Sequence, residues 1–336
     1  MGLSMKILVT GSEGSLMQSV IPRLLEQGHD IIGVDNLCRY GHRRTKDTRY
    51  KFEKVDLTER NDVNDLFKLY RPDYVIQAAA RIYGVGGFNQ YCADILGEDL
   101  TLHNNVLRAC VQNKVKRVVY ISSSMVYETC IQNTRIPVTE EMPNVVEAPK
   151  TDYGLSKFVG ERMCEAFAKQ YGLEYTIWRP FNIITPYETS EGDLGTSHVF
   201  ADYIKRIIID KKSELEIIGD GDQIRCFTWI DEIAQAISDY SFSDKSKNEI
   251  FNLGNLEPIS MRQLAFIIHQ TGVLMGALEN KPLVFKSTKS FKNDVRVRVP
   301  SSTKARLRFG WEAKQKVAES VKICVENALN SKPMVA

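Results

Sequence analysis

The chain has 336 residues, of which 43% are hydrophobic and 26% are charged, an ordinary composition for a folded globular protein. This composition excludes a fibrous or largely disordered protein. Because 44 Lys and Arg residues balance 42 Asp and Glu residues, the net charge is only +2, and no basic surplus favours a nucleic acid or an anionic membrane as partner. A small-molecule partner is therefore favoured.

Seven cysteines are scattered through the chain, and no two of them have CxxC spacing. This pattern favours neither a disulfide framework nor a zinc ribbon, and the five histidines show no paired-ligand spacing. No apolar run approaches the roughly 18 residues of a membrane span. We therefore expect a cytoplasmic protein with no metal site and no contact with a membrane.

Short β-branched segments alternate with amphipathic segments over the first half of the chain. Strands are expected at 7–9, 30–34, 52–55, 74–78, 117–121 and 175–178, with helices ending near 25 and spanning about 95–112 and 152–171. This alternation predicts an α/β protein with a doubly wound parallel sheet of the Rossmann type.

After residue 180 the alternation becomes less regular. A turn is expected at 219–222, with short helices near 196–211, 230–241 and 260–272. We interpret residues 1–180 as the sheet domain and residues 181–330 as a smaller C-terminal substrate-binding lobe.

A glycine-rich turn follows the first expected strand and opens the first helix. Gly11 and Gly14 stand where backbone N–H groups can approach a pyrophosphate. Asp35 ends the second strand, where a carboxylate accepts hydrogen bonds from ribose hydroxyls and repels a 2′-phosphate, so NAD is favoured over NADP. Three arginines close to Asp35 in sequence can soften that preference: Arg39, Arg43 and Arg44.

Asp56 follows the third expected strand. Its carboxylate can accept a hydrogen bond from the adenine amino group, or it can cap the next helix. Both interpretations stay open.

Tyr153 and Lys157 stand four residues apart at the start of a helix, so both side chains project from one face. A free tyrosine has a pKa of about 10, and a nearby ammonium group stabilises the phenolate and lowers that value. Ser122–Ser124 follow the strand at 117–121, at the sheet edge where ligands of such folds bind. Together these groups indicate proton transfer to and from a hydroxyl group.

At this point the chain resembles the extended short-chain dehydrogenase/reductases, and in particular their NAD-dependent nucleotide-sugar epimerases, dehydrogenases and reductases. The matching segments are Leu8–Gly11 with Gly14, Gly33–Leu37, Ala78–Ala80, Ser122–Tyr127, Tyr153–Lys157, Arg179–Asn182, Gly219–Gly221 with Arg225, Phe251–Gly254, and Thr303–Ala305 before Gly310 and Trp311.

The resemblance implies that Tyr153 is the acid/base, that Lys157 tunes the pKa of Tyr153 and binds ribose, and that Ser123 polarises the reacting oxygen, with Ser124 as the alternative. It implies cofactor contacts at Gly11, Gly14, Asp35, Asn36, Asp56, Leu57, Ala78 and Lys157. It implies substrate contacts at Ser124, Asn182, His198 and Arg225. A homodimer is also expected, because the family is often dimeric.

Three positions depart from the family pattern. Met17 replaces a third glycine, so we expect a shifted helix or an altered seat for NAD. Asp99 replaces an asparagine, and its charge should stabilise the Lys157 ammonium and weaken the pKa shift of Tyr153. The place of a late phosphate-binding arginine is taken by Phe291, and the possible replacements are Lys289, Lys292 and Arg296.

The residues after Ser124 bear on the reaction. Met125 and Val126 stand where family dehydratases carry an acid pair, so dehydration is disfavoured. The segment around His198 and the glycine-rich segment 84–88 resemble GDP-sugar enzymes, but Met125 replaces their partner cysteine, and a thioether cannot shuttle protons.

Hydride exchange at a sugar hydroxyl carbon remains. We expect an NAD-dependent nucleotide-sugar epimerase that acts through a transient keto-sugar. The first alternative is a dehydrogenase or reductase of a GDP- or other nucleotide-linked sugar, and the second is a catalytically silent nucleotide-binding relative.

Overall fold

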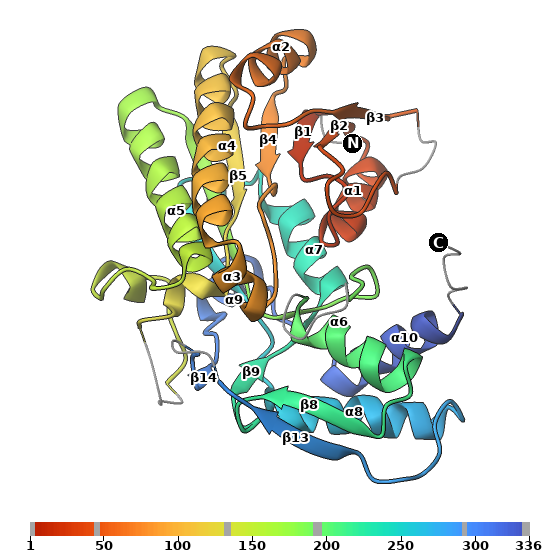
Figure 1. Ribbon diagram of the computed structural model, residues 1–336. Coiled ribbons are helices and arrows are strands. Elements are labelled where there is room, and N and C mark those ends of the chain that lie inside the picture. Colours follow the sequence, from red (N-terminus) through yellow and green to blue (C-terminus); the bar gives the residue numbers. More distant parts are fainter. Residues whose placement is uncertain (1–3, 44–47, 131–135, 191–196, 291–293, 331–336) are drawn as a thin grey trace.

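The computed structural model describes residues 4–43, 48–130, 136–190, 197–290 and 294–330. Its centre is a parallel sheet, as expected from the sequence. The sheet has seven strands in the order β11-β6-β5-β4-β1-β2-β3 (Figure 1). The strands are β1 (Lys6–Thr10), β2 (Asp30–Asp35), β3 (Tyr50–Lys54), β4 (Tyr74–Gln77), β5 (Arg117–Ile121), β6 (Glu174–Pro180) and β11 (Glu249–Leu253).

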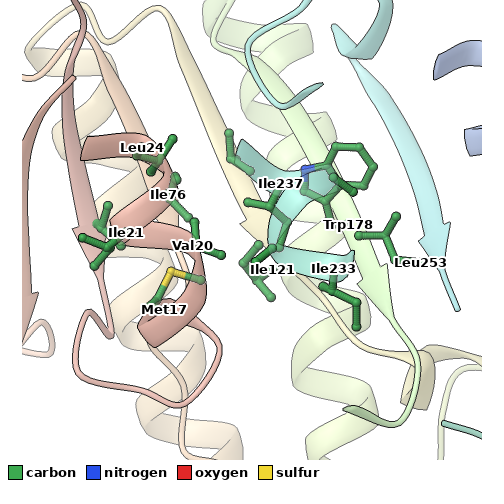
Figure 2. Packing of buried hydrophobic residues seen from close by; sticks show 14 of the residues in the cluster. Met17, Val20, Ile21, Leu24, Ile76, Ile121, Trp178, Ile233, Ile237 and Leu253 are labelled. Atoms are coloured by element: carbon green, nitrogen blue, oxygen red, sulfur yellow. The ribbon is translucent and has the colours of Figure 1, made fainter. Parts of the chain in front are cut away.

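Helices cover both faces of this sheet. Residues of α2 (Arg60–Tyr70), α4 (Cys92–Gln112) and α5 (Asp152–Tyr171) share one buried cluster with the strands. On the other face, α1 (Met17–Glu26), α7 (Ile230–Tyr240) and α9 (Thr303–Phe309) share a second cluster, part of which is shown in Figure 2. The central strands are buried on both sides, which explains their nearly continuous apolar sequences.

β6 is not the edge strand of the sheet, because a later strand, β11, lies beside it. β11 pairs with β6 in parallel, and α7 packs beside α1. The sheet and the helical layer that covers it therefore both include residues from beyond the expected domain boundary at residue 180. The sequence did not indicate β11 as a sheet strand, because a five-residue apolar run carries no signal of its pairing partner.

The remaining elements form the lobe below the sheet in Figure 1, around a separate buried cluster. β8 (Glu214–Ile218) pairs with β13 (Val284–Thr288), β9 (Ile224–Cys226) lies between β12 (Pro258–Ser260) and β14 (Val297–Arg298), and β7 (Ile183–Ile184) pairs with β10 (Thr228–Trp229). Its helices are α6 (Val199–Tyr203) with the π-helical segment Ile204–Ile209, α8 (Met261–Leu274) and α10 (Val317–Asn330). The expected turn at 219–222 connects β8 to β9.

All seven cysteines lie in the described ranges, and each is a free thiol. No helix in those ranges has the length and apolar character needed to cross a membrane.

Candidate active site

The glycine-rich turn after β1 requires its first glycine. Gly11 has a φ of +63°, and a Cβ atom there would lie 2.8 Å from the backbone nitrogen of Ala79. The N–H of Gly14 donates to the Gly11 carbonyl at 3.0 Å, which closes the turn. The backbones of β1 and of the segment after β4 therefore meet too closely for any side chain at Gly11.

Met17 begins α1, so the helix starts beyond the glycine-rich turn instead of at Gly14. The Met17 side chain is buried in the cluster shared by α1 and α7 (Figure 2). The thioether thus contributes to the core on this face of the sheet.

Asp35 lies at the end of β2 with its carboxylate held by two backbone donors. The N–H of Leu37 donates to Oδ1 at 2.8 Å, and the N–H of Glu13 donates to Oδ2 at 3.0 Å. Burial raises the pKa of Asp35, and the nearby Glu13 carboxylate raises it further. Each carboxylate oxygen accepts more than one hydrogen bond, so both retain capacity for ribose hydroxyls.

Glu13 is a buried carboxylate that was not predicted to belong to the site. It accepts hydrogen bonds from the Tyr50 hydroxyl at 2.9 Å and from the Arg43 backbone N–H. A Cβ on Gly33 would lie 2.2 Å from the Tyr50 hydroxyl, so glycine at this position makes room for the tyrosine. Glu13 and Asp35 line the same cleft, and their two charges repel an anion at this end of it.

The arginines near Asp35 are engaged across the cleft. Arg39 donates to the Ile82 carbonyl at 2.7 Å and lies 3.4 Å from Glu188, while Arg43 donates to the Tyr187 carbonyl at 2.8 Å. Arg44 lies outside the described residues. Because both described guanidinium groups already contact protein groups, they are less available for the 2′-phosphate of NADP, which favours NAD.

Asp35→Ala should therefore reduce the preference for NAD over NADP, by about tenfold or more, because each 1.4 kcal/mol of lost discrimination is a factor of ten. Calorimetric titration with both cofactors measures the ratio. Asp30→Ala, an exposed position at the start of the same strand, is the matched control and should leave the ratio unchanged. Tighter binding of NADP than NAD by the unchanged protein would show that the arginines dominate.

The other expected cofactor residues lie along the same cleft, which Asn36, Asp56, Leu57 and Ala78 line together with Gly11, Gly14 and Asp35. Asn36 Oδ1 accepts from the Cys38 N–H at 3.1 Å. Asp56 is not the cap of α2, because that position is Glu59. Its Oδ1 instead accepts from the N–H and hydroxyl of Thr58. The helix-cap alternative for Asp56 is therefore wrong.

Ser123, Tyr153 and Lys157 meet where β5 ends against the first turns of α5. Ser123 Oγ accepts from the Met125 N–H at 3.2 Å, and the Ser123 hydroxyl is close enough to Tyr153 to lower the pKa of the tyrosine. Lys157 is 2% exposed, and its ammonium group donates to the Ile121 carbonyl at 3.0 Å. Ser124 instead begins the 3-10 turn Ser124–Tyr127 and is buried.

The electrostatic balance at Tyr153 is set mainly by burial, which raises its pKa. The Ser123 hydroxyl and the charges of Arg298 and Arg39 lower the pKa of Tyr153, but by less than burial raises it. Lys157 lies 5.8 Å from the tyrosine ring centroid, and burial lowers its own pKa. The expected lowering of the tyrosine pKa by Lys157 is therefore not present in this structure, because desolvation outweighs it.

Asp99 lies on α4, beneath this group, and is fully buried. Its carboxylate accepts from the Arg81 N–H at 2.8 Å and from the Ser156 hydroxyl at 3.0 Å. Its charge raises the pKa of both Lys157 and Tyr153. Both effects have the directions expected from the sequence.

Two supports of the site had no clear sequence signal. Phe88, on α3 (Val85–Gln90), stacks on the Tyr153 ring with 4.8 Å between centroids. Glu161, one turn after Lys157, accepts two hydrogen bonds from Arg179 of β6 at 2.8 and 2.6 Å and one from Ser122. These contacts fix α5 against the ends of β5 and β6.

The expected substrate residues come from the C-terminal part of the chain. Asn182 Oδ1 is buried and has no hydrogen-bond partner among the described residues. Arg225 of β9 is buried and lies 3.1 Å from Asp294. His198 precedes α6, and its Nδ1 lies 2.7 Å from Oε1 of Glu188.

The two described replacements for the late arginine, Lys289 and Arg296, are both exposed. Arg296 contacts both carboxylate oxygens of Asp220, at 2.8 and 2.6 Å. Phe291 and Lys292 lie outside the described residues.

The model of the NAD dependent epimerase/dehydratase family matches residues 7–254. This chain belongs to that family. It is 27% identical to GDP-L-fucose synthase 1 of Arabidopsis thaliana over 278 residues, which cover 82% of this chain and 80% of the relative. It is 29% identical to a putative UDP-glucose 4-epimerase of Methanocaldococcus jannaschii over 279 residues, with 82% and 86% covered.

Among solved structures, the UDP-glucose 4-epimerase of Thermotoga maritima with UDP-glucose superposes with a TM-score of 0.81. The two chains are 28% identical, and the match covers 96% of this chain and 98% of that one. The epimerase/dehydratase family is NAD-dependent. The cleft fits this cofactor, since the turn at Gly11 excludes any side chain and Asp35 is positioned by two backbone donors.

Proposed function

We propose that this protein is a nucleotide-sugar epimerase that acts through a transient keto-sugar, with NAD held in the cleft beside β1 and β2. The observation that carries the proposal is the cluster of Ser123, Tyr153 and Lys157 at the carboxyl end of β5. A binding module has no need for a buried lysine beside a tyrosine and a serine hydroxyl, which argues against a catalytically silent relative.

In this proposal Gly11, Gly14 and Asp35 hold the dinucleotide, with Asn36, Asp56, Leu57 and Ala78 along the adenosine end. When bound, NAD supplies a reversible acceptor for the hydride.

Tyr153 takes the proton from the sugar hydroxyl and later returns it, and Ser123 donates a hydrogen bond to the reacting oxygen. Lys157, held on the Ile121 carbonyl, binds a ribose hydroxyl of the cofactor through its remaining N–H donors.

We assign the nucleotide-sugar diphosphate to Asn182 and Arg225, which gives residues 181–330 their substrate-binding role. An amide and a guanidinium group are both suited to phosphate oxygens. The Nδ2 group of Asn182 and the guanidinium group of Arg225 would donate these hydrogen bonds, since the Oδ1 of Asn182 is an acceptor and cannot bind a phosphate oxygen.

The pair of His198 and Glu188 supports a second candidate, a dehydrogenase or reductase of a nucleotide-linked sugar. Nδ1 of His198 contacts Glu188, so its Nε2 is left to exchange a proton with a substrate. Both residues line the same cleft as Asp35. One similar protein is named GDP-L-fucose synthase 1, so GDP-linked sugars belong among the substrates to be tested.

Substrate and excess NAD distinguish the two candidates. An epimerase retains the hydride through the whole cycle, so two sugar epimers should interconvert without accumulation of free NADH. Product stereochemistry by NMR and the absorbance of NADH are measured together on a panel of UDP- and GDP-sugars. NADH formed in step with a keto-sugar would replace the epimerase by the dehydrogenase, with Tyr153, Lys157 and Ser123 in the same roles.

A further inference from the structure

Five arginine side chains of the described chain are buried, and four of them have a carboxylate partner. The four pairs are Arg117 with Glu174 at 3.0 Å, Arg179 with Glu161 at 2.6 Å, Arg206 with Asp202 at 2.9 Å, and Arg225 with Asp294 at 3.1 Å. The fifth, Arg298, is 6% exposed and forms no ion pair with any described carboxylate. A buried charge without a partner is costly and is a feature that needs an explanation.

Arg298 lies on β14, directly opposite Arg225 of β9 in the register of the small sheet. Its Nη1 donates to the sulfur of Met125 at 2.9 Å, and a thioether is only a weak acceptor. Its Nε has no hydrogen-bond partner within the described ranges. The guanidinium group therefore has donors to spare in a buried position.

This guanidinium group lies at the reacting end of the site. Met125, which it contacts, packs in one cluster with Tyr153 and Phe88. Arg298 is also close enough to Tyr153 for its charge to lower the pKa of the tyrosine. A group bound beside Tyr153 would therefore lie close to Arg298.

Arg225 and Arg298 differ in whether a described carboxylate lies within ion-pair distance of the guanidinium group. The charge of Arg225 is balanced by Asp294 at 3.1 Å. Burial and the neighbouring Arg225 lower the pKa of Arg298 to about 9, while the charges of Asp294, Glu128 and Tyr153 raise it. Arg298 therefore stays charged at neutral pH without an ion pair of its own among the described residues, which favours binding of an anion.

We propose that Arg298 binds a carboxylate carried by the sugar, so that the substrate is a nucleotide-linked sugar acid. The planar fork of a guanidinium group matches a carboxylate with two parallel hydrogen bonds, and a neutral hydroxymethyl group would leave the charge uncompensated. The diphosphate is the other possible anion. It is attached at the anomeric carbon, and it is already assigned to Asn182 and Arg225. This inference rests on the proposed function, since it assumes a nucleotide sugar in this cleft.

The test compares ligands that differ only at the sugar carbon that carries the carboxylate. UDP-glucose is compared with UDP-glucuronate, GDP-mannose with GDP-mannuronate, and both pairs with UDP and GDP alone, by calorimetry on NAD-saturated protein. We expect the acid of at least one pair to bind at least about tenfold more tightly than its neutral partner, and Arg298→Met to remove that difference. Affinity for UDP or GDP alone should not change.

Arg296→Met is the matched control, because Arg296 is on the same segment but is exposed and bound to Asp220. It should retain the preference for the acid. Thermal unfolding provides a second measurement. Arg298→Met removes an unbalanced buried charge and should not lower the Tm, whereas Arg179→Met, which leaves Glu161 unpaired, should lower it.

Three results would overturn the proposal. Equal affinity for acid and neutral sugars would show that no carboxylate is recognised. Weaker binding of UDP or GDP alone by Arg298→Met would make Arg298 a diphosphate ligand, while the proposed function would stand. Failure of every nucleotide and nucleotide sugar to bind would overturn the proposed function together with this inference.

Discussion

Tyr153→Phe should lower turnover by about 10²–10⁴-fold while NAD still binds, because the change removes the hydroxyl that carries the substrate proton and retains the ring. The ring still stacks on Phe88, so the fold around the site should persist. Turnover of the identified substrate and NAD affinity by calorimetry are measured on the same preparation. Because burial raises the pKa of Tyr153, the phenolate fraction and the rate of the unchanged enzyme should increase as the pH rises.

Tyr171→Phe is the control for this experiment, since Tyr171 ends the same helix and is 47% exposed. Its turnover should equal that of the unchanged enzyme. Near-normal turnover of Tyr153→Phe would contradict the assignment and would point to His198, which Glu188 holds in the same cleft, as the proton-transfer group.

Gly11→Ala should abolish or strongly weaken NAD binding. Its φ of +63° strains any other residue by about 1–2 kcal/mol, and a Cβ atom would lie 2.8 Å from the Ala79 nitrogen and 2.9 Å from its Cα. The backbone segments on both sides of the turn must then separate. We expect NAD affinity to fall by at least about tenfold and the Tm to fall as well.

Gly28→Ala separates these two contributions. Gly28 has a φ of +87°, in the same left-handed region, but a Cβ atom there meets nothing within 4 Å. It should lower the Tm through backbone strain alone and leave NAD affinity unchanged. If the two variants lose NAD affinity equally, the close approach between Gly11 and Ala79 is not what matters.

Much of the site could be predicted because its residues have local signals. Tyr153 and Lys157 are recognisable by their helical spacing, and Asp35 is recognisable by its position at the end of an apolar strand. The strands of the sheet were recognisable for the same reason, since a strand buried on both faces is apolar throughout. Such features depend on residues that are close together in sequence.

The residues that escaped prediction depend on pairing between distant segments. Arg298 acquires its role from the register between β14 and β9, and Phe88 from stacking on a helix more than 60 residues away. Glu13 is defined by Tyr50, which reaches it only because residue 33 is glycine. None of these contacts follows from periodicity or composition.

The position of β11 has a consequence for biosynthesis. During translation, β6 is complete once residue 180 has been made, but its outer edge stays unpaired until residues 249–253 follow. Over that interval Trp178 lacks Phe251, which packs against it with 5.1 Å between ring centroids in the finished protein. The nascent sheet therefore exposes an apolar edge of the kind that pairs with other chains, and we expect chaperone dependence to be greatest before residue 253 leaves the ribosome.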